Sequence, residues 1–511
     1  MREVARSGSV IAGLALGVVI AVGAGWAMGD QVGCGVLLGQ AQQMLEHQHP
    51  KQARVMIRSA LAKCPRNAQA YSLLGISYDQ QNLYPEAEKA YHKAIALDPN
   101  WAGFHNNLAA SYLHAGKTTE AIAEFQKALR LDPQNHLAGL NLANYYLNRS
   151  DYARSLRYFR QAGADHSQDP AVLFGLAKAY FGARQPQSGL EIAEKLSRLA
   201  GADSKVHFSI GLLLAENGRY GEAIRELQAI PPGERDFAVY QNLGLAYVKS
   251  GKASEAEGAF EEAMRLNPAS PEPYWGLGQI FFSTHRLEQG IYWLSQAHQR
   301  APQRPDITFA LAEALIQAQQ SNRADDLLTD AVKQHPHDAA LLQAVGDLYT
   351  EEHKDELAKR AYERSLEIDP HHLGSRLGLA KLYDRLGKNA QAQEEYEAIL
   401  KRAPGNAEAN LGLGRLALQS GKFNEAVTTL ERALRSDPNN QAAMENLAAA
   451  RIHLGQYAEA QGVLQRLVMM NADNSRAHYL LGQALLKMGQ KKKAELEFER
   501  SRQLKSASAT R

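Results

Sequence analysis

The chain has 511 residues, of which 45% are hydrophobic and 22% charged, and its 57 basic and 55 acidic residues leave a net charge of +2. This balance provides no broad positive field to hold a polyanion, which argues against a nucleic-acid partner. Length alone suggests about three domains, while the composition is typical of a soluble helical protein.

Residues 1–33 stand apart because they contain an uncharged stretch from Ser7 to Gly29. Its 23 residues are enough to cross a bilayer, since a membrane-spanning helix needs about 20. Two interpretations remain open. The segment is a retained membrane anchor, or it is a secretory signal cleaved before Asp30, where Ala27 and Gly29 are small enough for a signal peptidase.

Both interpretations predict the same topology for the rest of the chain. Arg2 and Arg6 precede the uncharged stretch, and no cation follows it until Lys51. The positive-inside rule therefore predicts that everything after the segment lies on the extracytoplasmic (periplasmic) side, anchored or secreted. Small residues at every fourth place suggest a homodimer through this helix, although more than half of the stretch is Gly, Ala or Ser and the spacing can arise by chance. These residues are Ser9, Gly13, Gly17, Ala21, Gly25 and Gly29.

A 34-residue period runs from Cys34 almost to the end of the chain. In each unit, apolar and small residues recur first at i, i+3, i+4 and i+7 and then at i, i+4 and i+7, which predicts two amphipathic helices. Between the stretches, glycine recurs at place 15, counted from the start of the unit, where it ends a helix in the left-handed conformation. A proline then stops the second helix. Examples are Tyr71, Leu74, Gly75, Tyr78, Ala87, Tyr91, Ala94 and Pro99, and the place-15 glycines are Gly116, Gly218, Gly251, Gly387, Gly421, Gly455 and Gly489.

These marks resemble the tetratricopeptide repeat, which has the same Tyr, Leu-Gly, Tyr, Ala, Tyr/Phe, Ala, Pro series at this spacing. The resemblance implies an all-α, right-handed superhelical solenoid of antiparallel helix pairs. Residues 34–508 then form about fourteen repeats followed by a tail of 509–511, and residues 170–236 are degenerate because Gly189 replaces a packing alanine and the closing proline is missing. The units start at residues 34, 68, 102, 136, 170, 204, 237, 271, 305, 339, 373, 407, 441 and 475.

The two cysteines, Cys34 and Cys64, fall near the two ends of the first unit. In an antiparallel hairpin these ends are neighbours, so a disulfide is geometrically possible. Two alternatives remain: a pair of unpaired thiols in a reducing compartment, or lipidation of Cys34 after Gly33, for which Gln31 does not fit the usual motif.

Signatures of catalysis are absent from the sequence, which has no phosphate-binding loop, no H-E-x-x-H and no G-x-S-x-G. The repeats leave no segment long enough for a catalytic domain, so we expect no enzyme activity and no cofactor. Inter-unit loops carry four histidines that suggest helix capping more than a metal site. They are His335, His337, His371 and His372.

The remaining candidate site is the concave groove that the resemblance places along the first helices. Amide side chains there suit a peptide backbone, because each offers a donor and an acceptor. Aromatic side chains suit apolar groups of a ligand, although packing between units explains them equally well. The amides are Asn106, Asn107, Asn141, Asn144 and Asn148, and the aromatics are Phe174, Phe181, Phe208, Trp275, Phe282 and Phe309.

The sequence therefore predicts a non-catalytic scaffold, tethered to or exported across a membrane, that binds protein or peptide partners in its groove. The expected context is a cell-envelope assembly. The alternative is a regulatory or substrate-recruiting subunit of a separate enzyme, such as a glycosyltransferase.

Overall fold

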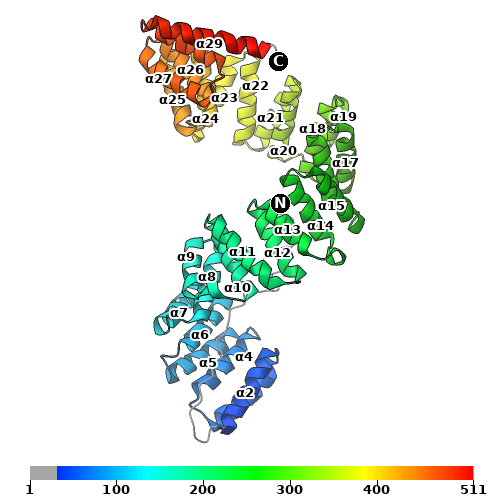
Figure 1. Ribbon diagram of the computed structural model, residues 1–511, viewed down its shortest axis with the longest axis vertical. Coiled ribbons are helices and arrows are strands. Elements are labelled where there is room, and N and C mark those ends of the chain that lie inside the picture. The colour runs from blue at the N-terminus through cyan, green and yellow to red at the C-terminus, as the bar shows by residue number, and fades with distance from the viewer. Residues whose placement is uncertain (1–31, 510–511) are drawn as a thin grey trace. The chain divides into compact units, whose positions relative to one another are not determined.

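A computed structural model describes residues 32–509 (Figure 1). This part of the chain is helical throughout, with two short 3₁₀ turns and no strand. The uncharged segment at residues 7–29 lies outside the described residues. Within residues 32–509, no helix combines the length and apolar character needed to cross a membrane.

The chain divides into two compact units, residues 1–280 and 281–511, and the division falls inside α16 (Glu272–Ser283). In the first unit the helices are α2 (Val32–Glu46), α3 (Pro50–Lys63), α4 (Ala68–Asp79), α5 (Tyr84–Leu97), α6 (Ala102–His114), α7 (Thr118–Leu131), α8 (His136–Asn148), α9 (Tyr152–Gln161), α10 (Pro170–Gly182), α11 (Pro186–Ala200), α12 (Ser204–Glu216), α13 (Tyr220–Ala229), α14 (Phe237–Lys249) and α15 (Ala253–Leu266). Its 3₁₀ turns are η2 (Ala164–His166) and η3 (Pro232–Glu234).

The second unit continues with helices of the same length and spacing. They are α17 (Leu287–Arg300), α18 (Pro305–Gln317), α19 (Ser321–Gln334), α20 (Ala339–Glu351), α21 (Asp355–Ile368), α22 (Leu373–Arg385), α23 (Asn389–Arg402), α24 (Ala407–Gln419), α25 (Phe423–Ser436), α26 (Gln441–His453), α27 (Tyr457–Met470), α28 (Ser475–Lys487) and α29 (Lys491–Ala509). Within each unit, an even-numbered helix begins a pair and packs against the odd-numbered helix that follows, as α4 does on α5 and α24 on α25. The predicted all-α solenoid of helix pairs is therefore confirmed.

Local signals in the sequence begin and end these helices. Asn67 caps α4, because its side-chain oxygen accepts a hydrogen bond from the Ala70 N–H at 2.9 Å. Asn406 caps α24 in the same way through the Ala409 N–H, also at 2.9 Å. Such caps satisfy backbone donors that the first helical turn leaves without partners.

The turn between the two helices of each pair has one backbone conformation throughout. All seven predicted glycines at place 15 have positive φ angles, between 71° and 79°. The other seven units carry a side chain there in the same left-handed conformation, with φ between 57° and 61°. These residues are Gln48, Asn82, Ser150, Arg184, His285, Gln319 and His353. The turn geometry is thus dictated by the pairing of the helices, even where the side chain disfavours it.

Aromatic rings from the second helices fill the space between successive pairs. The fully buried Phe260 of α15 contacts Gly244 of its own pair and Gly276 of the next first helix. In the second unit, Tyr362 of α21 lies in the same way against Gly346 and Gly378. A Cβ on any of these glycines would fall 2.5–2.6 Å from a ring carbon. Each ring therefore belongs to two neighbouring repeats, which explains why small residues recur at these places.

Candidate functional site

Within each unit, the first helices form a continuous layer. In the first unit α4, α6, α8, α10, α12 and α14 each contact the next in turn, and in the second unit α20, α22, α24, α26 and α28 do so. Second helices of neighbouring pairs make no comparable contact among residues 32–509. Because the first helices lie closer together, each stack curves with these helices on the inside. We call the solvent-facing side of this layer the inner face.

Three of the five predicted asparagines are joined to one another. The Asn141 amide of α8 donates to Asn106 Oδ1 of α6 at 3.0 Å, and the Asn106 amide donates to Asn107 Oδ1 at 3.2 Å. The Asn107 amide then donates to the Ser72 hydroxyl of α4 at 3.1 Å. All four side chains are buried. Hydrogen bonds between buried polar groups fix the register of neighbouring helices, so this series connects three repeats.

The other two asparagines, Asn144 and Asn148, lie at the C-terminal half of α8. Asn144 is 8% exposed, and its side-chain oxygen has no hydrogen-bond partner among the described residues. It lies beside Gly175 of α10, where a Cβ would approach the Asn144 oxygen to 3.6 Å. Asn148 is exposed. As a buried acceptor without a partner, the Asn144 oxygen costs free energy, whereas the exposed amide of Asn148 is accessible to a ligand.

The predicted aromatic residues differ in how far they are buried. Phe174 and Phe181 of α10 contact the same apolar cluster, Phe174 half-buried and Phe181 only 7% exposed. The Phe181 ring occupies the space beside Gly189 of α11, which explains the missing alanine at that place. Phe208 of α12 is 8% exposed. Phe181 and Phe208 are thus mainly packing residues, whereas the half-buried Phe174 keeps part of its ring accessible.

The remaining aromatic residues lie in different units. Trp275 of α16 belongs to the first unit, and Phe282 and Phe309 belong to the second. All three are half-buried. Each therefore combines packing with an accessible edge, and the structure does not assign them to one role alone.

One further inner-face residue, Gln241 of α14, was not among the predicted site residues. Its side chain is 2% exposed, and the amide oxygen has no hydrogen-bond partner among residues 32–509. It occupies place 5, the same place as Phe174 and Phe208. The place was visible in the sequence, but its lack of a partner was not.

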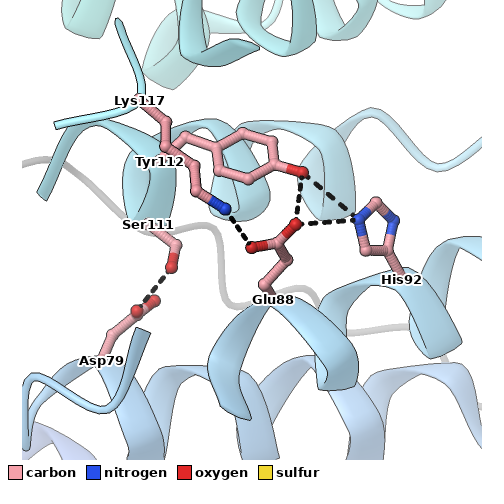
Figure 2. A network of polar contacts seen from close by, with 6 residues as sticks. All are labelled: Asp79, Glu88, His92, Ser111, Tyr112 and Lys117. Carbon is pink, nitrogen blue, oxygen red and sulfur yellow. Dashed lines mark hydrogen bonds and ion pairs between the residues drawn. The ribbon is translucent and has the colours of Figure 1, made fainter. Parts of the chain in front are cut away.

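Polar contacts at the ends of the first helices hold neighbouring repeats together (Figure 2). The Lys117 ammonium lies 2.6 Å from Glu88 Oε2, and the Tyr112 hydroxyl donates to Glu88 Oε1 at 3.1 Å. Hydrogen bonding from Lys117 outweighs burial and lowers the pKa of Glu88. Burial, together with the charge of Glu88, raises the pKa of Tyr112 to about 12. In the second unit, Lys354 and Asp325 form the equivalent ion pair, also at 2.6 Å.

A second recurrent pair joins the two helices of a single repeat. His105 is 1% exposed, and its Nδ1 lies 2.6 Å from Glu124 Oε2 while its Nε2 lies 3.0 Å from the Pro99 carbonyl. Burial raises the pKa of the Glu124 carboxyl, but the hydrogen bond and charge of His105 outweigh this and leave the pKa lowered. Both partners present acceptor oxygens to the imidazole ring. The same arrangement occurs at His207 and His478.

The two cysteines of the first repeat lie side by side as free thiols. Cys34 is buried and donates to the Ala60 carbonyl at 3.8 Å, and its thiol is within hydrogen-bonding reach of Cys64. Burial, with the hydrogen bond and charge of Cys64, raises the pKa of Cys34 to about 11. The disulfide itself stays a prediction, for which the structure provides the necessary proximity.

Of the loop histidines, His372 caps α22, because its Nδ1 accepts from the Ser375 N–H at 3.3 Å. Across residues 32–509, no three His, Cys, Asp or Glu side chains converge in a group that could hold a metal ion.

Comparison with protein families returns the tetratricopeptide repeat along almost the whole described chain. One model of this repeat matches residues 38–100, 73–136, 140–203, 174–235, 242–305, 377–441 and 411–460. A second matches 286–348 and 451–504, and a third matches 339–372. No catalytic family is among the matches. No curated protein matches the sequence.

Several solved structures are similar to this chain at low identity. Yeast Tom70 is 16% identical with a TM-score of 0.40, over 83% of this chain and 96% of that one. The APC/C hetero-tetramer Cut9–Hcn1 is 14% identical with a TM-score of 0.35, over 89% of this chain and 97% of that one. Naa15/Naa10 bound to HypK-THB is 16% identical with a TM-score of 0.33, over 92% of this chain and 75% of that one. At such values these structures carry no inference about function.

Proposed function

The chain belongs to the tetratricopeptide repeat family, and from this premise we propose that it is a non-catalytic scaffold that binds a protein or peptide segment along its inner face. The observation that carries the proposal is the accessible polar and aromatic lining of the inner face, where Asn148 of α8 is exposed and Phe174 of α10 is half-buried. An extended peptide presents backbone N–H groups that an accessible amide oxygen accepts without regard to sequence. The accessible edge of the Phe174 ring supplies an apolar contact beside it.

Site-specific photo-crosslinking tests this location. A photoreactive residue at Asn148, which is exposed at the end of α8, reports on the inner face. The matched control is the same residue at Arg130, exposed on the second helix α7. We expect stoichiometric adducts with a protein partner from position 148 and few from position 130. Adducts from position 130 alone would move the binding surface to the outer helices and contradict the proposal.

We infer further that the repeats are tethered to, or exported across, a membrane and serve a cell-envelope assembly. Support comes from the 23 uncharged residues at 7–29, with Arg2 and Arg6 before them. The adjacency of Cys34 and Cys64, suited to an oxidising compartment, points the same way. A homodimer through the small residues of that segment is part of this proposal. Identification of the crosslinked partner separates it from the alternative role, because an enzyme in equal amount indicates a recruiting subunit.

A further inference from the structure

An open cleft of about 930 Å³ lies outside the inner face, at the edge of the first unit. It is formed by the turn after α8, one side of the second helix α9, and the C-terminal end of α10 (Figure 1). Four arginines line it: Arg149, Arg157, Arg160 and Arg184. All four are exposed. In a chain of net charge +2, this is a local concentration of positive charge.

The cleft contains almost no compensating negative charge. Asp151 is its one acidic lining residue. One oxygen of this carboxylate accepts from the Arg154 backbone N–H at 3.1 Å, and the other lies 2.9 Å from Arg154 Nε. The carboxylate is thus already committed to the cap of α9 and to Arg154. None of the four cleft arginines forms an ion pair with a carboxylate of residues 32–509.

Aromatic rings hold three of these arginines in place. The guanidinium of Arg149 lies 5.2 Å from the centre of the Tyr145 ring, and that of Arg157 lies 4.9 Å from the Tyr158 ring. The guanidinium of Arg160 lies 5.9 Å from the centre of the Tyr180 ring. Contacts of this kind orient the planar guanidinium. Arg157 also donates one N–H to the Tyr158 hydroxyl at 3.1 Å, and its other N–H groups have no hydrogen-bond partner among the described residues.

The fourth arginine, Arg184, is held in an unfavourable backbone conformation. It occupies place 15, where seven other repeats carry glycine, and its φ is 58°. An arginine disfavours this left-handed conformation, which glycine adopts at no cost. Six other repeats carry a non-glycine residue at this place in the same conformation, so the strain belongs to the turn. Arg184 contributes to the cleft through the charge of its exposed side chain.

We propose that this arginine cleft binds an acidic segment of a partner protein, one that carries clustered carboxylates. The proposal rests on the proposed function as a protein-binding scaffold and adds a second contact surface to it. Guanidinium groups form bidentate hydrogen bonds with the oxygens of carboxylates and phosphates. The volume of the cleft is that of a ligand pocket, which is smaller than a continuous groove for a nucleic-acid backbone. The balanced net charge of the chain also argues against nucleic acid.

Fluorescence anisotropy with the full chain tests the proposal. Three eight-residue peptides serve as probes: one rich in Asp and Glu, one with phosphoserines in their place, and one with Gln and Asn. We expect the anionic peptides to bind and to weaken steeply as salt rises, and the neutral peptide not to bind. Clearly tighter binding of the phosphoserine peptide than of the Asp and Glu peptide would overturn the assignment to carboxylates. Equal affinity for the neutral peptide, or tighter binding of a single-stranded oligonucleotide, would overturn the proposal.

The place-15 residues provide a matched pair of variants. Arg184→Gly removes a cleft guanidinium and also relieves the left-handed strain, so we expect about tenfold weaker binding without a lower melting temperature. Gln319→Gly makes the same backbone change in the second unit and should leave peptide binding unchanged. Undiminished binding after Arg184→Gly combined with Arg160→Gln would refute the site. Asn148 directly precedes Arg149 of the cleft, so the inner face is tested separately with a photoreactive residue at Glu216, which is exposed at the end of α12. Adducts from position 216 should persist in this case, so failure here is distinct from failure of the inner-face scaffold.

Discussion

The ring of Phe260 lies so close to Gly276 of the following repeat that a Cβ there would stand 2.5 Å from its Cζ atom. We therefore expect Gly276→Val to lower the free energy of unfolding by about 1–3 kcal/mol, the usual cost of overpacking a core. Chemical denaturation monitored by circular dichroism measures it. Gly258 is the control, since it lies exposed within α15 with nothing near its Cβ position. Gly258→Ala should be neutral or slightly stabilising, and equal losses for both variants would contradict the packing argument.

The His105–Glu124 pair predicts a charge requirement at place 4. In the repeat that starts at residue 373, Arg376 takes the place of histidine and contacts Glu395 Oε2 at 2.6 Å and the Pro370 carbonyl at 2.7 Å. His105→Arg should therefore be tolerated, whereas His105→Gln should cost about 2 kcal/mol by leaving a half-buried carboxylate without its cation. Thermal melting of the two variants side by side provides the measurement. A glutamine variant as stable as the arginine variant would show that the charge is not needed.

The same pair predicts acid sensitivity. The pKa of Glu124 is lower in the folded state than in the unfolded state, because the hydrogen bond and charge of His105 outweigh burial. A lowered carboxyl pKa stabilises the fold above the ordinary glutamate value of about 4.3, and this contribution is lost as the pH falls through the lowered value. Wild-type protein should thus lose more stability than Glu124→Gln between about pH 5 and pH 3. Equal losses of stability for the two proteins over this pH range would contradict the stabilising role of the Glu124 carboxylate.

The inner-face aromatics predict two separable outcomes. If Trp275 and Phe309 contact a ligand, Trp275→Ala or Phe309→Ala should weaken partner binding by about 2 kcal/mol with little change in melting temperature. If they are packing residues, the same changes should destabilise the array by about 3–5 kcal/mol. Binding and melting should be measured on each single variant, since the residues lie in different units. Unchanged binding with a strongly lowered melting temperature would remove that residue from the site.

The thiols predict a defined order of reactivity. In reduced protein near pH 8, the half-buried Cys64 should be alkylated well before Cys34, because Cys34 is buried and its pKa is raised to about 11. In native material purified without reductant, mass mapping should find the two residues joined. Two free thiols in promptly alkylated native protein would withdraw the support that the cysteines give to an exported location.

Topology can be tested independently of the cysteines. A reporter that is active only outside the cytoplasm, fused after Arg511, should be active, because the cations Arg2 and Arg6 precede the uncharged segment. Replacing these two arginines by glutamine and placing lysines after Gly29 should reduce the activity. Activity of a cytoplasmic reporter at the same position would contradict export.

The sequence predicted the helix pairs well because their signals are local. A glycine such as Gly116 and a capping residue such as Asn67 act within a few residues of themselves. It did not reveal that Arg184 would adopt the glycine conformation, since only packing of the flanking helices imposes it. Nor did it reveal that Asn106 and Asn141 bond to each other while Asn144 does not. The place of an amide in a repeat is encoded locally, whereas its partner depends on the neighbouring repeat.

The sharing of Tyr362 between Gly346 and Gly378 has a consequence for how the molecule can change in length. A duplicated or deleted block of 34 residues keeps the side chain at the place of Tyr362 in register with the places of Gly346 and Gly378, wherever the block begins. A longer or shorter array therefore keeps the same core packing between neighbouring repeats. An insertion that is not a whole number of periods would separate this side chain from one of the two places that it contacts. The array can therefore lengthen or shorten only by whole repeats without losing these contacts.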